Sequence, residues 1–133
     1  QQRHIEELAT PVLRLWKGVL AVPLIGRVEA WRAAQLMDAL LAAIQREKAS
    51  VVVIDITGVT QVDADVAKRL LKTAHAARLV GARCMLVGIR AEVARTIVES
   101  GIDIDDVQIY STLEQALARI IDREKAESAP SSS

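Results

Sequence analysis

The stretch VVVIDITGVTQVDADVAKRL, residues 51–70, decides the fold because it joins a strand pattern to a helical pattern through a short polar segment. The β-branched run at residues 51–56 predicts a strand that is covered on both faces of its sheet. The helix is predicted to begin near Asp63 or Ala64. We interpret the polar segment between them as a loop that carries carboxylates and hydroxyls, with Asp55, Thr57, Thr60, Asp63 and Asp65.

Strand and helix patterns also alternate before and after this stretch. Residues 11–26 predict two short strands joined at Lys17 and Gly18, because glycine readily adopts the positive φ of a tight hairpin turn. Apolar residues recur at helical spacing over residues 31–44, which predicts a helix. The helix that follows the polar segment has a similar apolar stripe and is expected to stop at Gly81.

The carboxyl-terminal half continues this alternation. Residues 82–89 predict a third buried strand, residues 92–99 a short helix, and residues 107–110 a last strand. Ser111 followed by Glu114 is a capping-box pattern that predicts the start of a terminal helix. The complete order predicts an α/β fold, in which a mixed, mostly parallel β-sheet carries an N-terminal β-hairpin and about four α-helices.

Composition limits the classes of partner. The chain has 133 residues, 51% of them hydrophobic, which is enough for one domain with an apolar core. Its formal net charge is zero, so no global field favours nucleic acid or an anionic membrane surface. It has no Phe, one Tyr and two Trp, and no apolar run approaches the length of a membrane-spanning helix. We therefore predict a cytoplasmic protein that binds neither nucleic acid nor membrane.

Three segments are expected along the chain. Residues 1–10 are polar and form either a frayed leader or the end of a linker helix, since Ile5 and Leu8 have helical spacing. Residues 11–122 form the folded domain. Residues 123–133 are polar and end in ESAPSSS, which predicts a disordered tail.

The sequence lacks the patterns of several common enzyme sites. It contains no dinucleotide-binding G-x-G-x-x-G, no phosphate-binding G-x-x-x-x-G-K-[ST] and no G-x-S-x-G nucleophile elbow. His4 lies in the leader and His75 in a predicted helix, without an evident nucleophile opposite either of them. Cys84 lies in the apolar run CMLVGI and is interpreted as a small buried hydrophobe. We predict neither catalysis nor a cofactor.

The polar segment is expected at the carboxyl ends of the strands, where ligands and functional loops gather in α/β sheets. Asp55, Asp63 and Asp65 offer oxygen ligands, but their spacing is not that of an EF-hand loop, and capping and turn roles are favoured. No metal site is therefore predicted. A phosphoreceiver is an alternative of a different class, because Asp55 ends a strand. The acidic pair and the lysine that receivers also use do not occupy the matching places.

Three segments carry a family resemblance: LIGRVEAWRAAQLMDALL at residues 24–41, VVVIDITGVTQVDADVAKRLLKTAHAARLVGARCMLVGI at 51–89, and GIDIDDVQIYSTLEQAL at 101–117. In order and spacing they resemble the STAS domain of anti-sigma-factor antagonists, and within that family the R-type co-antagonist subunit of the bacterial stressosome. The resemblance spans residues 11–121. It implies the STAS fold and a non-enzymatic stress-signalling scaffold. In R-type members a sensor domain precedes the STAS domain and joins it through a helical linker.

The resemblance also implies partners and a switch. STAS modules of this type self-associate, assemble with S-type STAS paralogues and bind a switch serine/threonine kinase to regulate a sigma factor or another stress output. The family's phosphoacceptor positions correspond to Ala30 and Ala64, which follow Glu29 and Asp63, and R-type members carry threonine there. Alanine has no hydroxyl, so neither position can accept phosphate. Natural divergence and deliberate substitution are both compatible with this difference.

Two interpretations of the charged helix start are open. Asp63 and Asp65 either supply permanent negative charge to a locked or differently regulated scaffold, or simply cap the helix and favour its first turn. The hydroxyls of Thr57 and Thr60 are expected in turn hydrogen bonds rather than as phosphorylation sites.

The polar segment and the helix start form the expected partner-docking surface. Its residues are Asp55, Thr57, Thr60, Asp63, Asp65 and Lys68, with Glu29, Trp31 and Arg32 as further interface candidates. Trp31 suits an interface anchor, although packing within its own domain is favoured. The cluster of Lys68, Arg69 and Lys72 is either a solvated helix face or a surface for an acidic partner. A nucleotide- or small-molecule-binding STAS module is the alternative among binding proteins.

Overall fold

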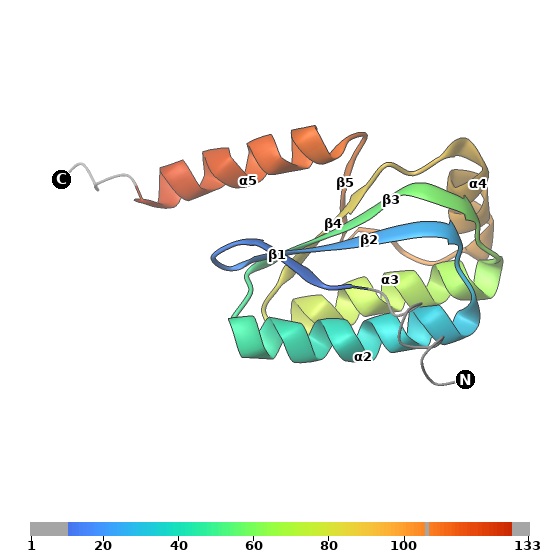
Figure 1. Ribbon diagram of the computed structural model, residues 1–133. Helices are drawn as coiled ribbons and strands as arrows, with labels where there is room; N and C mark the ends of the chain where they lie inside the picture. Colours follow the sequence, from blue (N-terminus) through green and yellow to red (C-terminus); the bar gives the residue numbers. More distant parts are fainter. Residues whose placement is uncertain (1–10, 106, 129–133) are drawn as a thin grey trace.

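The computed structural model describes residues 11–105 and 107–128, which form a sheet flanked by helices (Figure 1). The sheet has five strands in the order β1-β2-β3-β4-β5. Their bounds are Leu13–Trp16 for β1, Val19–Arg27 for β2, Val51–Gln61 for β3, Arg83–Val87 for β4 and Val107–Tyr110 for β5. β1 and β2 are antiparallel and the other neighbouring pairs are parallel. The predicted mixed sheet with an N-terminal hairpin is confirmed, and Gly18 in its turn has a φ of 77°.

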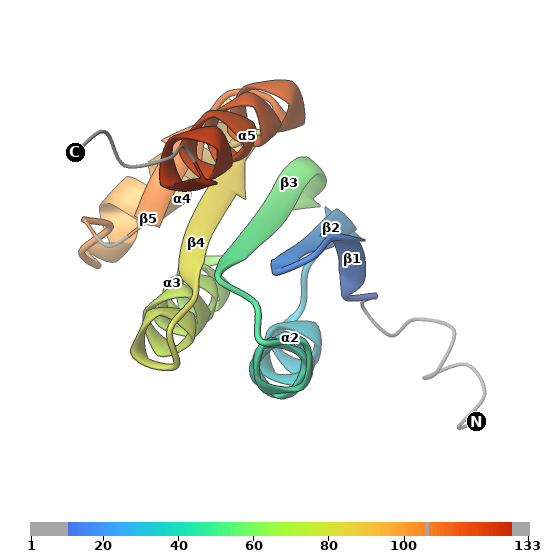
Figure 2. The same ribbon diagram turned by 90° about the vertical axis from the view of Figure 1, so that its left-hand side faces the viewer.

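Four helices in the described ranges cover the two faces of the sheet. α2 (Ala30–Glu47) and α3 (Ala64–Leu79) lie side by side on one face, and α4 (Ala91–Ser100) packs beside α3 (Figure 1). α5 (Leu113–Ser128) lies on the opposite face, as Figure 2 shows. The arrangement is therefore a three-layer α/β structure, with the helices that connect parallel strands packed against the sheet.

The sheet divides the apolar core into two unequal parts. The larger part lies between the sheet and α2, α3 and α4, and the smaller part lies under α5. Side chains of β3 alternate between them: Val52 and Ile54 face the larger part, whereas Val51 and Val53 face α5. β3 is thus covered on both faces, as its β-branched run predicted.

β3 is longer than the sequence pattern predicted. The strand continues to Gln61, so the predicted loop is wrong for three of its polar residues, Asp55, Thr57 and Thr60. Beyond Asp55, β3 has no further partner in β4 but continues beside β2, whose pairing register shifts after Pro23. The ends of β2 and β3 therefore form a two-stranded ribbon that extends past the rest of the sheet.

A bulge in this ribbon explains why the strand was hard to see in the sequence. Ile56 and Val59 both face the larger core although they are three residues apart. Strict alternation would place residues at that spacing on opposite faces. Between Asp55 and Gly58, β3 has one residue more than the paired segment of β2. This bulge puts Ile56 and Val59 on the same face, so the sequence does not alternate regularly between apolar and polar residues.

Two predictions for the terminal helix are wrong. The cap is Thr112 rather than Ser111: Thr112 Oγ1 accepts a hydrogen bond from Gln115 N at 3.1 Å, while Gln115 Oε1 accepts one from Ser111 N at 3.1 Å. The predicted disordered tail does not begin at Arg123, because α5 continues through it to the last described residue. Arg, Glu, Lys and Ala are strong helix formers, and Arg123 Nε donates to Glu127 Oε1 at 3.2 Å.

Some predictions concern residues beyond those described. The leader or linker helix at residues 1–10, which contains His4, lies outside the described residues, as does the tail beyond residue 128. Among the helices of residues 11–105 and 107–128, none combines the length and the apolar character that crossing a membrane requires.

Candidate functional site

The starts of α2 and α3 meet at the end of the β2–β3 ribbon. The backbone N–H of Val28 donates to the carbonyl of Gln61 at 3.1 Å and joins the two strand-to-helix connections. A pocket of about 400 Å³ lies between them, lined by Arg27, Val28, Glu29, Ala30, Gln61, Val62 and Asp63. Ala30 is the first residue of α2 and Ala64 the first residue of α3, and both are exposed. The two positions that the family resemblance matched to phosphoacceptors thus begin neighbouring helices.

Sequence reasoning missed four residues of this pocket, Arg27, Val28, Gln61 and Val62. The available signal was that neighbouring parallel strands end at the same edge, so the residues after one strand meet those after the other. Using that signal required β3 to extend to Gln61, and the predicted loop concealed this extension.

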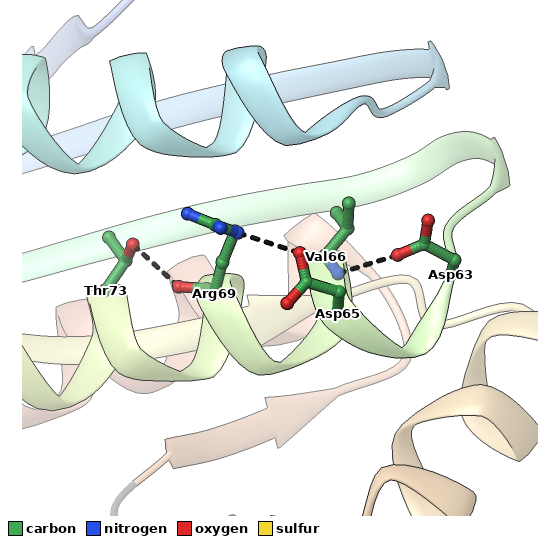
Figure 3. A network of polar contacts seen from close by, with 5 residues as sticks. All are labelled: Asp63, Asp65, Val66, Arg69 and Thr73. Carbon is green, nitrogen blue, oxygen red and sulfur yellow. Dashed lines mark hydrogen bonds and ion pairs between the residues drawn. The ribbon is translucent and has the colours of Figure 1, made fainter.

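The start of α3 is held by two carboxylates with local partners (Figure 3). Asp63 Oδ1 accepts a hydrogen bond from Val66 N at 2.8 Å, which confirms the predicted cap and helix start. Asp65 Oδ2 accepts one from Arg69 Nε at 3.0 Å. One turn later, Thr73 Oγ1 donates to the carbonyl of Arg69 at 3.0 Å. The capping interpretation therefore describes what these side chains do, and their charges lie where the helix dipole favours them.

The start of α2 is built differently. Glu29 precedes the helix, but its side chain makes no cap hydrogen bond. Arg32 instead reaches back to β2, where its Nη1 donates to the carbonyls of Ile25 at 3.1 Å and Arg27 at 3.2 Å. Arg32 therefore fixes the end of β2 to α2. Trp31 packs only in part, with 42% of its surface exposed, and its ring is accessible to a partner.

Asp55 and Thr57 form a separate unit on β3. Asp55 Oδ1 accepts hydrogen bonds from Thr57 Oγ1 at 2.6 Å and from Thr57 N at 3.0 Å. Asp55 is in register with Val87, which belongs to the core under α5, so this unit lies on the α5 side of the sheet. Gly88 packs against Thr57 with a φ of 78°, and an added Cβ there would overlap the Thr57 side chain. The Thr57 hydroxyl is thus engaged within the strand rather than in a turn.

The predicted acidic segment is therefore divided by the sheet. Asp55 lies on the α5 side, whereas Asp63 and Asp65 lie at the start of α3. Within residues 11–105 and 107–128, no group of three or more His, Cys, Asp and Glu side chains is arranged to hold a metal ion. Thr60 is exposed near the end of β3, and Lys68 is exposed one turn after the cap of α3.

The remaining candidates lie within the larger core or along α3. Cys84 is 2% exposed, and burial raises the pKa of its thiol to about 12. The thiol is therefore protonated at neutral pH and packs as a small hydrophobe, in agreement with its position in an apolar run. His75 is half-buried on α3, which agrees with a partly packed helix residue.

Known proteins resemble this chain in sequence over most of its length. Residues 10–116 match the sequence profile of the STAS domain. The chain is 39% identical over 117 residues to the RsbT co-antagonist protein RsbRA of Bacillus subtilis strain 168, covering 88% of this chain and 43% of the relative. It is 38% identical over 117 residues to the co-antagonist RsbRB of the same organism, covering 88% and 42%. The chain thus spans less than half the length of these curated relatives.

Solved structures show the same fold. A substituted form of RsbS from Moorella thermoacetica matches with a TM-score of 0.73 and 25% identity, over 87% of this chain and 97% of that chain. A chain from a structure of the stressosome, described as a signal integration and transduction hub, matches with a TM-score of 0.72 and 25% identity, over 86% and 99%. The anti-sigma factor antagonist SpoIIAA in its unphosphorylated form shares the fold at a TM-score of 0.71 and 16% identity, over 86% and 97%.

Proposed function

This chain belongs to the STAS domain family, and on that premise we propose that it is a non-enzymatic scaffold in bacterial stress signalling. It self-associates, assembles with S-type STAS paralogues and binds a switch serine/threonine kinase of the RsbT type, and so regulates a sigma factor or another stress output. Similarity to two RsbT co-antagonist proteins and to RsbS supports this proposal.

The paired helix starts are the observation that carries the proposal. Two helix N-termini flank one pocket, whose wall also carries Arg27, Glu29 and Asp63. The start of α2 has no side-chain cap, whereas Asp63 caps the start of α3. The first residues of both helices, Ala30 and Ala64, are exposed, and Trp31, which follows Ala30, is partly exposed. A partner protein that docks at this edge contacts both helix starts at once, and Trp is a favoured anchor of such interfaces.

Alanine at both positions fixes the charge of this surface. A phosphate on a hydroxyl at either place would add about two negative charges at a helix start and so change how a partner docks. Ala30 and Ala64 remove this chemistry. The carboxylates of Asp63 and Asp65 accept hydrogen bonds from Val66 N and Arg69 Nε, within α3 itself. The scaffold therefore binds its kinase constitutively, without release by phosphorylation at these two positions.

Light scattering on size-exclusion chromatography tests the assembly. The chain is run alone, with an S-type paralogue, and with that paralogue and the RsbT-type kinase, all from the same genome. We expect a co-assembly much larger than one copy of each protein, which retains kinase when ATP is present. A monomer or dimer that ignores both proteins overturns the proposal.

Restoring the hydroxyls tests the assignment of the two positions. Ala30→Thr, Ala64→Thr and the control Ala42→Thr, exposed further along α2, are incubated with the kinase and labelled ATP. We expect label in at least one of the first two variants, and none in the control or the unsubstituted chain. Absence of label from both Ala30→Thr and Ala64→Thr contradicts the assignment.

A nucleotide- or small-molecule-binding STAS module is a second candidate. The pocket of about 400 Å³ favours it, because it lies at two helix N-termini, which attract anions, and Arg27 stands in its wall together with Glu29 and Asp63. Calorimetric titration with ATP and GTP separates the two functions. Heat of binding that is lost in Arg27→Ala supports this candidate, whereas no heat at millimolar nucleotide removes it.

A further inference from the structure

A second groove runs between α2 and α3, separate from the pocket at their starts. Its volume is about 310 Å³, and its lining residues are Ala33, Ala34, Met37 and Asp38 of α2 with Asp65, Lys68, Arg69 and Lys72 of α3. The α2 wall is mainly small and apolar. The α3 wall carries long basic side chains, which are the cluster that the sequence pattern singled out.

Charge is distributed unevenly across this groove. Arg69 is paired with Asp65, with Nε and Oδ2 3.0 Å apart. In the part of the chain that the structure describes, no ion pair reaches the exposed Lys68 and Lys72. They are four residues apart, so they lie on one face of α3 with a rise of about 6 Å between them. The α3 wall thus offers two cations without ion partners, and the α2 wall offers the carboxylate of Asp38.

We propose that this groove docks an amphipathic helix of a partner protein, whose acidic flank faces α3. Two carboxylates four residues apart on such a helix match the spacing of Lys68 and Lys72 when it lies along α3. The alanines of the α2 wall allow a second helix to approach to about 8–10 Å between axes, with Met37 as an adaptable apolar contact. The opposite flank of the docked helix is neutral or basic and faces Asp38.

The mixed charge of the groove favours a protein over a phosphate-rich partner. Three basic and two acidic side chains line it, which leaves an excess of only one positive charge. Nucleic acid or an anionic bilayer would bring dense negative charge against Asp38 and Asp65. A protein helix can carry opposite charges on its two flanks and so complement both walls.

The inference rests on the proposed function for the choice of its first probe, the RsbT-type kinase. Asp65 and Lys68 already belong to the expected docking surface. The groove extends that surface along α3 by more than one turn, to Lys72.

Charge reversal tests the α3 wall. Kinase binding is measured for the unsubstituted chain, for Lys68→Glu/Lys72→Glu, and for the control Lys17→Glu/Arg95→Glu, which makes an equal charge change at exposed positions outside the groove. We expect about tenfold weaker binding for the first variant, a much smaller change for the control, and weakening of the unsubstituted complex by salt. Circular dichroism confirms that both variants fold.

The outcomes separate this inference from the proposed function. If the kinase binds equally well to the unsubstituted chain and to Lys68→Glu/Lys72→Glu, the groove is not its docking site, while the scaffold function stands. If the unsubstituted chain binds no kinase, the proposed function fails, and a peptide titration then decides on the groove alone.

The peptide probe is a stapled helix with a leucine and alanine face and two glutamates four residues apart, compared with the same peptide carrying lysines instead. NMR of the labelled chain follows the amides of α2 and α3. Shifts confined to groove residues, seen with the glutamate peptide and lost in Lys68→Glu/Lys72→Glu, support the inference. No difference between the two peptides overturns it. Tighter binding to duplex DNA or to phosphatidylserine vesicles than to the glutamate peptide also overturns it.

Discussion

The two faces of the sheet differ in how much protein covers them. On one face, α2, α3 and α4 bury most of the apolar core, whereas α5 alone covers the other face (Figure 2). From α5, Ala116 and Ile120 are buried in a smaller cluster, and Leu113 and Leu117 are partly buried against it. The end of α5 also extends past the β1–β2 hairpin, and residues 121–127 are exposed (Figure 1). The thickly covered face carries both the pocket and the groove. The candidate partner surface therefore stands on the better-packed side of the molecule.

The largest expected effect comes from matched truncations on the two faces. Leu40 of α2 is 0% exposed and Ile120 of α5 is 2% exposed. We expect Leu40→Ala to lower the free energy of unfolding by about 4 kcal/mol and Ile120→Ala by about 2 kcal/mol, because α5 can shift to close the cavity. Urea denaturation measures both. Equal losses would break the comparison, since each substitution removes the same number of carbon atoms.

Alkaline pH is expected to lower the free energy of unfolding through Cys84, which packs in the larger part of the core on the thickly covered face. Its thiol has a pKa of about 12 in the folded protein against 9.0 as the ordinary value. The folded state thus holds the proton more tightly, so this stabilisation is complete below pH 9 and declines as pH rises from about 9 to about 12. At pH 10 we expect an extra loss of about 1 kcal/mol relative to pH 8. Cys84→Ala lacks the thiol, so its free energy of unfolding should fall less steeply between pH 8 and pH 10. If it falls as steeply as that of the unsubstituted chain, Cys84 is not the cause.

The two helix starts on that face should respond differently to loss of a carboxylate. Asp63→Ala removes the cap of α3 and should lower the free energy of unfolding by about 1 kcal/mol. Glu29→Ala removes a side chain that caps nothing, so we expect a change within about 0.5 kcal/mol. Thermal denaturation of both variants at one pH provides the comparison. A larger loss for Glu29→Ala would show that its side chain stabilises α2 in another way.

The smallest effect is expected where α5 meets the hairpin. Trp16 Nε1 donates to Glu124 Oε2 at 3.1 Å in an exposed position. Glu124→Ala should lower the global free energy of unfolding by no more than about 0.5 kcal/mol, yet speed amide exchange in the last turns of α5. Asp122→Ala is the matched control on the same exposed segment. Unchanged exchange in α5 would show that this hydrogen bond does not hold the helix end.

The sequence predicted those parts of the fold in which a local pattern agrees with the packing. The run at residues 51–56 predicted a strand covered on both faces, and Asp63 predicted the cap of α3. These succeed because β-branched residues fit a sheet and a carboxylate accepts from the first turn of a helix. Parallel pairing followed from the alternation of strands and helices.

The failures lie where tertiary contacts override a local signal. Asp55, Thr57 and Thr60 suggested a loop, but pairing with β2 keeps this segment in the strand. Residues 123–128 have no apolar stripe, and helix propensity with the Arg123–Glu127 pair extends α5 through them. To predict the pocket and the groove, one must know which side chains of two helices lie opposite each other, and a single sequence does not give this. Sequence identified Asp65 and Lys68, but it did not predict Ala33 or Met37 as their neighbours.

The hydrogen bond between Val28 and Gln61 has a consequence for how such a surface can evolve. Both partners are main-chain atoms, so most substitutions at these residues preserve the bond. The spacing of Ala30 and Ala64 is thus a property of the backbone and does not depend on which side chains occupy the two positions. A hydroxyl can be gained or lost at either place without moving it. Substitution can therefore change the chemistry of the two positions while leaving the shape of the surface intact.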